Sequence, residues 1–107
     1  MTKYHATPTV VNGIRFDSKH EAERYRELLL LLRGGIISDL RLQHQITLIE
    51  GWKKPTGETV RPEVYKADFS YIKDGRRIYE DAKGMRTKEY LIKKKQALEK
   101  GIEIVEV

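Results

Sequence analysis

The sequence predicts an α/β protein of the mixed α+β kind, in which one mixed β-sheet is flanked by helices. Two segments show the apolar spacing of amphipathic helices, and several shorter segments show the two-residue alternation of strands. The strands between the two helical segments include a pair joined by a two-residue turn, and a last strand follows the second helix. With 107 residues the chain has room for one hydrophobic core, so we expect a single domain over residues 1–107.

The first third of the chain predicts an arm, a hairpin and a helix. Residues 1–9 carry no pattern and are expected to form a flexible arm. Asn12-Gly13 lies between short apolar segments, which predicts a hairpin over residues 10–16. Ser18 is expected to open the first helix, and Gly34-Gly35 to end it. The apolar residues that recur at helical spacing between them are Ala22, Tyr25, Leu29 and Leu32.

The middle of the chain predicts strands separated by a loop. Strand pieces are expected around Ile36-Ile37 and over residues 45–49. Residues 50–62 contain two glycines and two prolines, which indicates a loop or a wide hairpin tip. Residues 64–72 alternate clearly, with four apolar residues on one face and three polar residues on the other. The apolar set is Tyr65, Ala67, Phe69 and Tyr71; the polar set is Lys66, Asp68 and Ser70.

The last third predicts a strand, a helix and a strand. Asp74-Gly75 is expected to form a turn, after which residues 77–83 form the second strand of a hairpin. Thr87 is expected to cap a helix that runs to about Lys100 and stops at Gly101. Residues 102–107 form a closing strand.

Composition narrows the classes of function. Lysine and arginine number 21 against 16 acidic residues, so the formal net charge of +5 favours a polyanionic partner such as DNA. The absence of cysteine excludes disulfides and thiolate metal sites. No apolar run approaches the ~20 residues that span a bilayer, and the N-terminus has no signal-peptide core. We therefore expect no membrane partner and a cytoplasmic location.

The hairpin at Asp74-Gly75 brings acidic residues together. If these two residues form the loop, Lys73 pairs with Arg76, and the same register places Asp68 directly opposite Asp81. Alternation then puts both acids and Lys83 on one face of the sheet. Opposed carboxylates repel each other, and a divalent cation such as Mg²⁺ would neutralise them. Lys83 could orient a water or stabilise the charge on a phosphate under attack, so the set predicts metal-dependent phosphodiester hydrolysis.

Alternatives stay open for each of these residues. Asp68 and Asp81 could lie on a solvated face, each paired with a neighbouring lysine. Glu80 is the rival for the second carboxylate, because a one-residue shift of register would exchange it with Asp81. Glu21 completes the S-x-x-E pattern of a capping box with Ser18, so its default role is structural. The three histidines show no spacing typical of a metal site.

Basic residues near the second strand and on the last helix could meet a phosphate backbone. The alternative is a solvated face, and both interpretations stay open. Gly84 would let the backbone come close to a ligand. The candidates for DNA contact here are Arg86, Lys88, Lys93, Lys94 and Lys95.

An ordered set of motifs resembles the PD-(D/E)XK nuclease superfamily. The D-x-K unit at Asp81 to Lys83 and the preceding Asp68 carry the resemblance, and further matches extend it from Val11 to Val107. Within that superfamily the chain is similar to a family of small, mostly phage-encoded proteins of formerly unknown function. The proline-aspartate pair that names the superfamily is absent, since Ala67 precedes Asp68. The further matches are residues 16–18, 21–23, 42–43, 65–69, 80–84, Thr87, Tyr90 and 93–95.

The resemblance implies a fold, an activity and roles for the site residues. The fold would be a restriction-endonuclease-like core in α-β-β-β-α-β order. The activity would be a Mg²⁺- or Mn²⁺-dependent DNA endonuclease, with Asp68 and Asp81 holding the metal and Lys83 serving the attacking water. Glu21 would be the acidic residue from the first helix, acting in catalysis and as a metal ligand, and Gln43 would contact DNA.

The expected biological setting follows from the same resemblance. We expect a phage protein of DNA replication or recombination that cuts branched DNA such as Holliday junctions, works as a homodimer and acts in the host cell cytoplasm. The alternative from another class is a non-catalytic DNA-binding module of a recombination or replication complex. An RNA-directed nuclease and a single-strand exonuclease also stay open.

Overall fold

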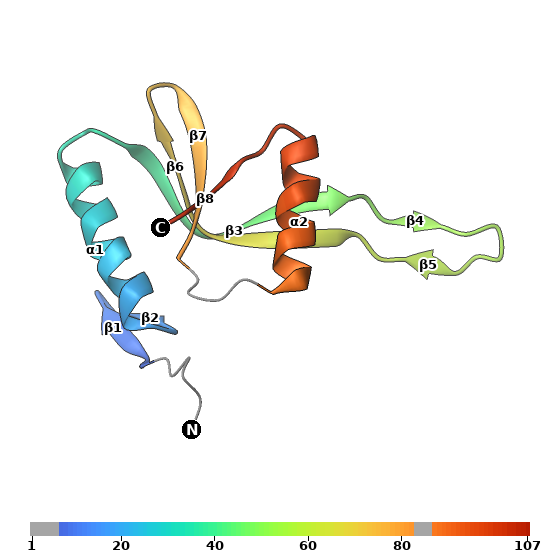
Figure 1. Ribbon diagram of the computed structural model, residues 1–107, viewed down its shortest axis with the longest axis horizontal. Helices are drawn as coiled ribbons and strands as arrows, with labels where there is room; N and C mark the ends of the chain where they lie inside the picture. Colours follow the sequence, from blue (N-terminus) through green and yellow to red (C-terminus); the bar gives the residue numbers. More distant parts are fainter. Residues whose placement is uncertain (1–6, 83–86) are drawn as a thin grey trace.

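A four-stranded mixed sheet in the order β3-β6-β7-β8 forms the centre of the protein (Figure 1). The computed structural model describes residues 7–82 and 87–107. Strands β3, β6 and β7 are antiparallel neighbours, and β8 runs parallel to β7. The strand bounds are β3 Ser38–Ile49, β6 Glu63–Lys73, β7 Arg76–Asp81 and β8 Ile104–Glu106.

A short hairpin and a capped helix precede the sheet. Strands β1 (Thr9–Val11) and β2 (Ile14–Phe16) pair around Asn12-Gly13, both of which have positive φ, as the hairpin turn requires. Helix α1 (Lys19–Arg33) begins after Ser18, whose hydroxyl accepts the Glu21 amide at 3.1 Å. It ends at Gly34, and Gly35 adopts a φ of +74°.

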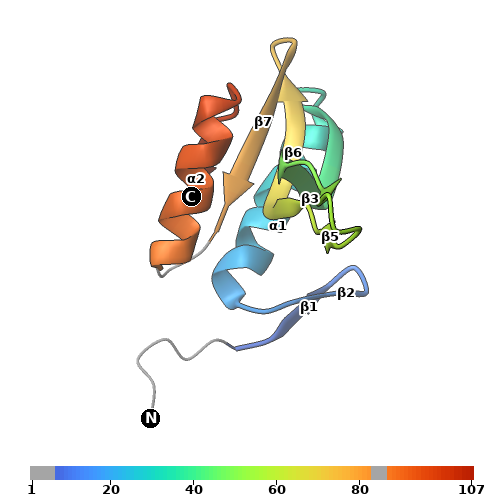
Figure 2. The same ribbon diagram turned by 90° about the vertical axis from the view of Figure 1, so that its right-hand side faces the viewer.

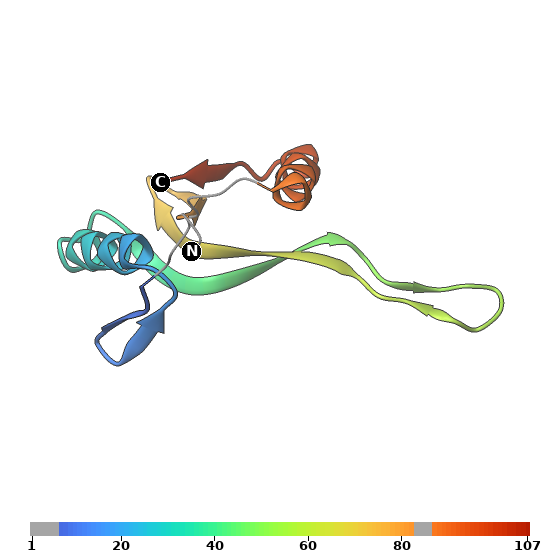
Figure 3. The same ribbon diagram turned by 60° about the horizontal axis from the view of Figure 1, so that its bottom comes forward.

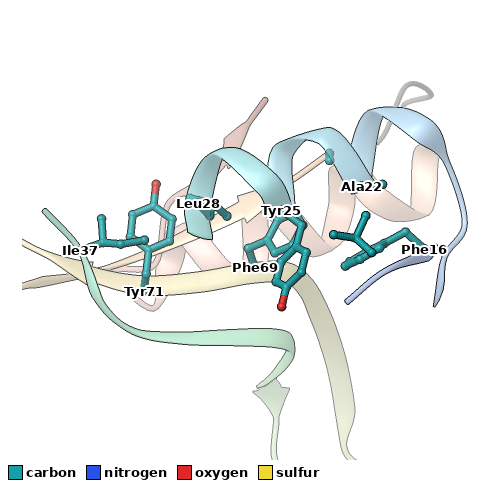
Figure 4. Close-up of a cluster of buried hydrophobic side chains, with 9 residues drawn as sticks. Phe16, Ala22, Tyr25, Leu28, Ile37, Phe69 and Tyr71 are labelled. Carbon is teal, nitrogen blue, oxygen red and sulfur yellow. The ribbon is translucent and has the colours of Figure 1, made fainter. Parts of the chain in front are cut away.

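The two helices cover opposite faces of the sheet (Figure 2). Arg24 of α1 reaches Glu80 of β7, and Tyr25 stacks on Phe69 of β6 with ring centroids 6.4 Å apart (Figure 4). Helix α2 (Lys88–Glu99), which begins after Thr87, packs on the other face. Each helix contributes residues to a separate apolar cluster on its face of the sheet. The α1 cluster includes Phe16, Ala22, Leu28, Phe69, Tyr71 and Ala82, and the α2 cluster includes Ile46, Leu48, Tyr65, Ala67, Tyr90, Ala97 and Ile104.

Strand β6 therefore contributes to both clusters, which corrects the prediction that its four apolar residues share one face. Phe69 and Tyr71 pack in the α1 cluster, whereas Tyr65 and Ala67 pack in the α2 cluster. The change comes at Asp68, where, among the residues that the structure describes, the pairing with β7 ends and the pairing with β3 continues. Two-stranded ribbons twist more strongly than wider sheets, and Figure 3 shows this ribbon turning away from the sheet.

The ribbon continues into a projecting arm (Figures 1 and 3). Strands β4 (Trp52–Lys53) and β5 (Thr59–Val60) pair with each other at its end. The arm gives the molecule extents of 51 × 44 × 24 Å and a radius of gyration of 16.2 Å. A compact chain of this length would have a radius of gyration of about 13 Å.

The predicted mixed class and element order are confirmed. Apart from the two small hairpins, the order is α1, β3, β6, β7, α2, β8, with the expected caps at Ser18 and Thr87. Ile36-Ile37, expected as a strand piece, precede β3 and lie in no strand, while the piece expected over residues 45–49 is the end of the longer β3. Of the two expectations for residues 50–62, the hairpin tip is the one observed, and β7 ends at Asp81 rather than at residue 83. Thr9, expected in the N-terminal arm over residues 1–9, begins β1. Among the described residues, no helix has the length and apolarity needed to span a membrane.

Candidate active site

The hairpin register predicted from Asp74-Gly75 is confirmed. Lys73 pairs with Arg76, and the ladder continues to Phe69 opposite Glu80. Asp68 and Asp81 are the next residues along the two strands, one step beyond the last pair of the ladder, so this register extended by one step sets the two acids across from each other. Both are buried, with 5% and 0% exposure. The alternative of a solvated face is therefore wrong for this pair.

Asp68 is held by two donors. Its Oδ2 accepts the backbone N–H of Ala82 at 2.8 Å, and its Oδ1 lies 3.4 Å from the side-chain amide of Gln43. Gln43 lies opposite Asp68 on β3, between the Leu42–Phe69 and His44–Ala67 pairs. It has a φ of +51°, a conformation that costs a non-glycine residue about 1–3 kcal/mol and tends to occur at functional sites. Gln43, predicted as a DNA contact, thus faces an acid of the site.

Asp81 is held by Tyr65, a residue that the sequence did not single out for the site. The Tyr65 hydroxyl donates a hydrogen bond to Asp81 Oδ2. Burial of Tyr65, followed by its hydrogen bond to Asp81, raises the pKa of its phenol well above the ordinary range. Tyr65 therefore stays protonated at neutral pH and remains a donor to the carboxylate. The ring of Tyr90 from α2 lies 6.1 Å from the Tyr65 ring.

Glu80 is not the second acid of this pair, because it faces α1 on the opposite side of the sheet. Its carboxylate receives two hydrogen bonds from Arg24, at 2.8 and 2.6 Å, and one from the Tyr71 hydroxyl. Glu80 is 1% exposed. Its position and partners give it a structural role in tying α1 to the sheet. The register thus resolves the choice between Glu80 and Asp81 in favour of Asp81.

Glu21 lies in the first turn of α1, on the helix that covers the face of Glu80. The neighbouring His20 bonds the Val107 carbonyl at 2.8 Å, so this turn docks where the sheet ends. Over residues 7–82 and 87–107, no three His, Cys, Asp or Glu side chains form a group that could hold a metal. Glu21 is therefore not brought into a three-ligand group with Asp68 and Asp81.

Glu106 is an acid near the site that the sequence analysis missed. Strand β8 pairs in parallel with β7, and Glu106 is the direct partner of Asp81. Its carboxylate accepts a hydrogen bond from the Tyr90 hydroxyl at 2.9 Å and lies 3.4 Å from the Lys94 ammonium. Alternation in the last strand could have indicated which face of the sheet Glu106 occupies. Its pairing with Asp81 could not be predicted, because β7 and β8 are connected through α2 and no local turn sets their register.

The basic residues of α2 differ in their surroundings. Lys93 lies 3.3 Å from Glu89, and Lys94 lies near Glu106, so both have acidic partners within the protein. Lys88 and Lys95 are exposed. Lys95 shares its side of the helix with Leu91 and Leu98, which are exposed as well. The predicted site residues Lys83 and Arg86 lie outside the described residues.

The acid pair fits a hard divalent cation. Mg²⁺ is commonly bound through one or two carboxylates while it keeps several waters. Asp68 and Asp81 supply two such groups from neighbouring strands, and hydrogen bonds from the Ala82 amide and the Tyr65 hydroxyl orient them. Mn²⁺ prefers the same carboxylate and water ligands. In ligand type, two carboxylates are therefore compatible with Mg²⁺ or Mn²⁺.

Comparison with known proteins gives a family but no described activity. A family model described as "Protein of unknown function (DUF1064)" matches residues 1–105. The chain belongs to the DUF1064 family. No curated protein and no solved structure shows significant similarity to this DUF1064 protein.

Proposed function

We propose that this protein is a metal-dependent nuclease that hydrolyses phosphodiester bonds in DNA. The observation that carries the proposal is the pair of buried carboxylates, Asp68 and Asp81, at one cross-strand position. Two facing acids in a buried site destabilise a fold unless something neutralises them. A divalent cation bound between the two carboxylates would neutralise both.

The residues divide the work as follows. Asp68 and Asp81 would hold the metal, and the Ala82 amide and Gln43 orient Asp68 while Tyr65 orients Asp81. The metal, when bound, supplies a Lewis acid and lowers the pKa of its water. Lys83 is proposed to serve the attacking water, and Glu21 to assist from α1. Both roles follow from the resemblance to the PD-(D/E)XK superfamily.

DNA is the proposed substrate because of charge. The chain carries a net charge of +5 although the candidate site is acidic, so positive charge lies elsewhere on its surface. Branched DNA and a homodimer belong to the same proposal. A chain of 107 residues has little surface with which to grip two DNA arms, and a dimer would supply two sites for two cuts. Sedimentation of the protein with and without a four-way junction tests this part, and a monomer in both conditions would contradict it.

The test of the activity is a cleavage assay with isosteric variants. Purified protein is incubated with plasmid, flapped and four-way DNA, with Mg²⁺, Mn²⁺ or EDTA. Asp68→Asn and Asp81→Asn should each lower the cleavage rate at least about 100-fold, because outer-shell changes alone cost 10–100-fold. Glu58→Gln, in the exposed arm, is the matched control and should cut at the wild-type rate.

The outcomes separate the proposal from its alternative. Metal-dependent cleavage that is lost in both aspartate variants, with DNA binding retained, supports the nuclease. DNA binding without cleavage by the wild-type protein on any of the substrates would favour the non-catalytic module. Cleavage at the wild-type rate by Asp81→Asn would overturn the assignment of the site.

A further inference from the structure

A groove of about 380 Å³ opens between the start of β6 and the first turns of α2. Its volume lies in the range of sites that enclose a small ligand. Most of its wall is apolar, and charged side chains stand among the lining residues. The residues that line it are Val64, Tyr65, Lys66, Thr87, Glu89, Tyr90 and Lys93.

The groove adjoins the acid pair through Tyr65. This side chain lines the groove, and its hydroxyl donates to Asp81. A group bound in the groove would therefore lie one side chain away from the carboxylates. The groove is on the α2 side of the sheet, away from the structural ion pair of Arg24 and Glu80.

The lining of the groove contains two tyrosines, Tyr65 and Tyr90, and two lysines, Lys66 and Lys93. The rings of Tyr65 and Tyr90 lie 6.1 Å apart and line the groove, and each residue is 6% exposed, so a nucleobase would pack against the part of each ring that the core leaves uncovered. Lys66 is exposed, and the Lys93 side chain is 24% exposed. Glu89, the acidic partner of Lys93, has a side chain that is 78% exposed, so solvent screens the pair and Lys93 can turn to a phosphate instead.

We propose that this groove binds one unpaired nucleotide of a DNA strand, with the base against the tyrosine wall and the flanking phosphates on Lys66 and Lys93. A base in a duplex is stacked and paired, so it cannot enter a concave site of this size without leaving the helix. The substrate class is therefore DNA with a single-stranded part, such as a flap or a branch point. The proposal rests on the proposed function only in placing this nucleotide beside the bond that is cut.

Binding is measured without catalysis, in EDTA, by fluorescence anisotropy of labelled DNA. The probes are a ten-nucleotide thymidine strand, a strand of equal length with abasic sugars at its centre, and a blunt duplex. We expect the thymidine strand to bind at least about 5-fold more tightly than the abasic strand, since base stacking on aromatic residues contributes on this scale. The duplex should bind more weakly than the thymidine strand at the same salt concentration.

Variants assign this binding to the groove. Lys66→Met and Lys93→Met keep the aliphatic stem and remove the charge, and each should weaken thymidine-strand binding and reduce its salt dependence by about 0.7 in log–log slope. Lys73→Met removes the same charge from the far end of β6, at an exposed position outside the groove, and is the control. Its binding and salt slope should match the wild type more closely than those of either groove variant.

Each result decides something. Equal affinity for the three probes would overturn the proposal, and so would a single-strand preference that Lys66→Met and Lys93→Met leave unchanged. If the groove variants lose single-strand binding while the wild type cuts no DNA, the proposed nuclease activity fails and the groove assignment stands. If the wild type cuts DNA but prefers the blunt duplex, the groove assignment fails alone.

Discussion

Replacing the carboxylate by an amide should have opposite effects at the neighbouring acids Glu80 and Asp81: at Glu80 it should lower stability, and at Asp81 it should abolish cleavage. Glu80 is 1% exposed and accepts two hydrogen bonds from Arg24 and one from Tyr71. Replacing its carboxylate by an amide in Glu80→Gln removes the buried counter-charge of the Arg24 guanidinium and leaves it only the solvent-screened Glu27 carboxylate, 3.2 Å away and 64% exposed. Breaking a buried ion pair in this way costs about 3–5 kcal/mol.

That loss is large compared with the stability of a small domain. At roughly 0.05–0.15 kcal/mol per residue, a chain of this length unfolds with a free energy of about 5–15 kcal/mol. We therefore expect Glu80→Gln to lower Tm by about 12–20 °C, given about 4 °C per kcal/mol for a domain of this size. Asp81→Asn keeps an acceptor for Tyr65 and should change the free energy of unfolding by no more than about 1 kcal/mol, while metal-dependent cleavage is lost.

Urea titrations and thermal melts of both variants, with cleavage assayed well below either Tm, provide the measurement. The double variant Arg24→Met/Glu80→Met should be more stable than Glu80→Gln, because it leaves no uncompensated charge. The reasoning is refuted if Glu80→Gln melts within about 2 °C of the wild type. It is also refuted if Glu80→Gln is fully folded at the assay temperature and loses cleavage as Asp81→Asn does.

Three further changes test other parts of the site. Tyr65→Phe should stay folded and lower cleavage about 10–100-fold, because Asp81 loses its orienting donor; kinetics on purified variants measure this. Mg²⁺ in 100-fold excess over its Kd should stabilise the wild type by about 2.7 kcal/mol and leave Asp68→Asn nearly unchanged in thermal melts. Burial and the hydrogen bond to Glu80 raise the pKa of Tyr71 to about 12, above the ordinary value of 10.0. The neutral phenol is thus favoured in the fold, so its contribution is complete below pH 10 and is lost as the pH rises toward 12. Urea unfolding of the wild type and Tyr71→Phe across that range should show a smaller loss in the variant.

Each of these has a result that contradicts it. Wild-type cleavage in Tyr65→Phe would remove that residue from the site. An equal rise in Tm with Mg²⁺ in Asp68→Asn would place the metal elsewhere. Parallel alkaline stability curves for the wild type and Tyr71→Phe would show that the Tyr71 phenol does not limit folding at high pH.

Local signals in the sequence predicted much of this structure. The turn at Asp74-Gly75 sets the register of β6 against β7, so the meeting of Asp68 and Asp81 could be derived from counting residues alone. The caps at Ser18 and Thr87 work through bonds to amides three residues away, and both helices begin where these residues predict.

Non-local contacts could not be predicted in the same way. The pairing of Glu106 with Asp81 depends on a parallel connection through α2, and no turn in the sequence fixes its register. The acidic partner that Lys94 finds in Glu106 follows from the same connection. The division of β6 between two clusters comes from ribbon twist after β7 ends, which alternation alone does not describe.

The projecting arm has a practical consequence for spectroscopy. Trp52, the single tryptophan of the chain, lies on β4 and is 54% exposed. Its indole already meets water in the folded protein, so its emission should change little when the hydrophobic clusters melt. The same emission should shift clearly when anything covers the arm, which makes Trp52 a built-in optical reporter of what the ribbon touches.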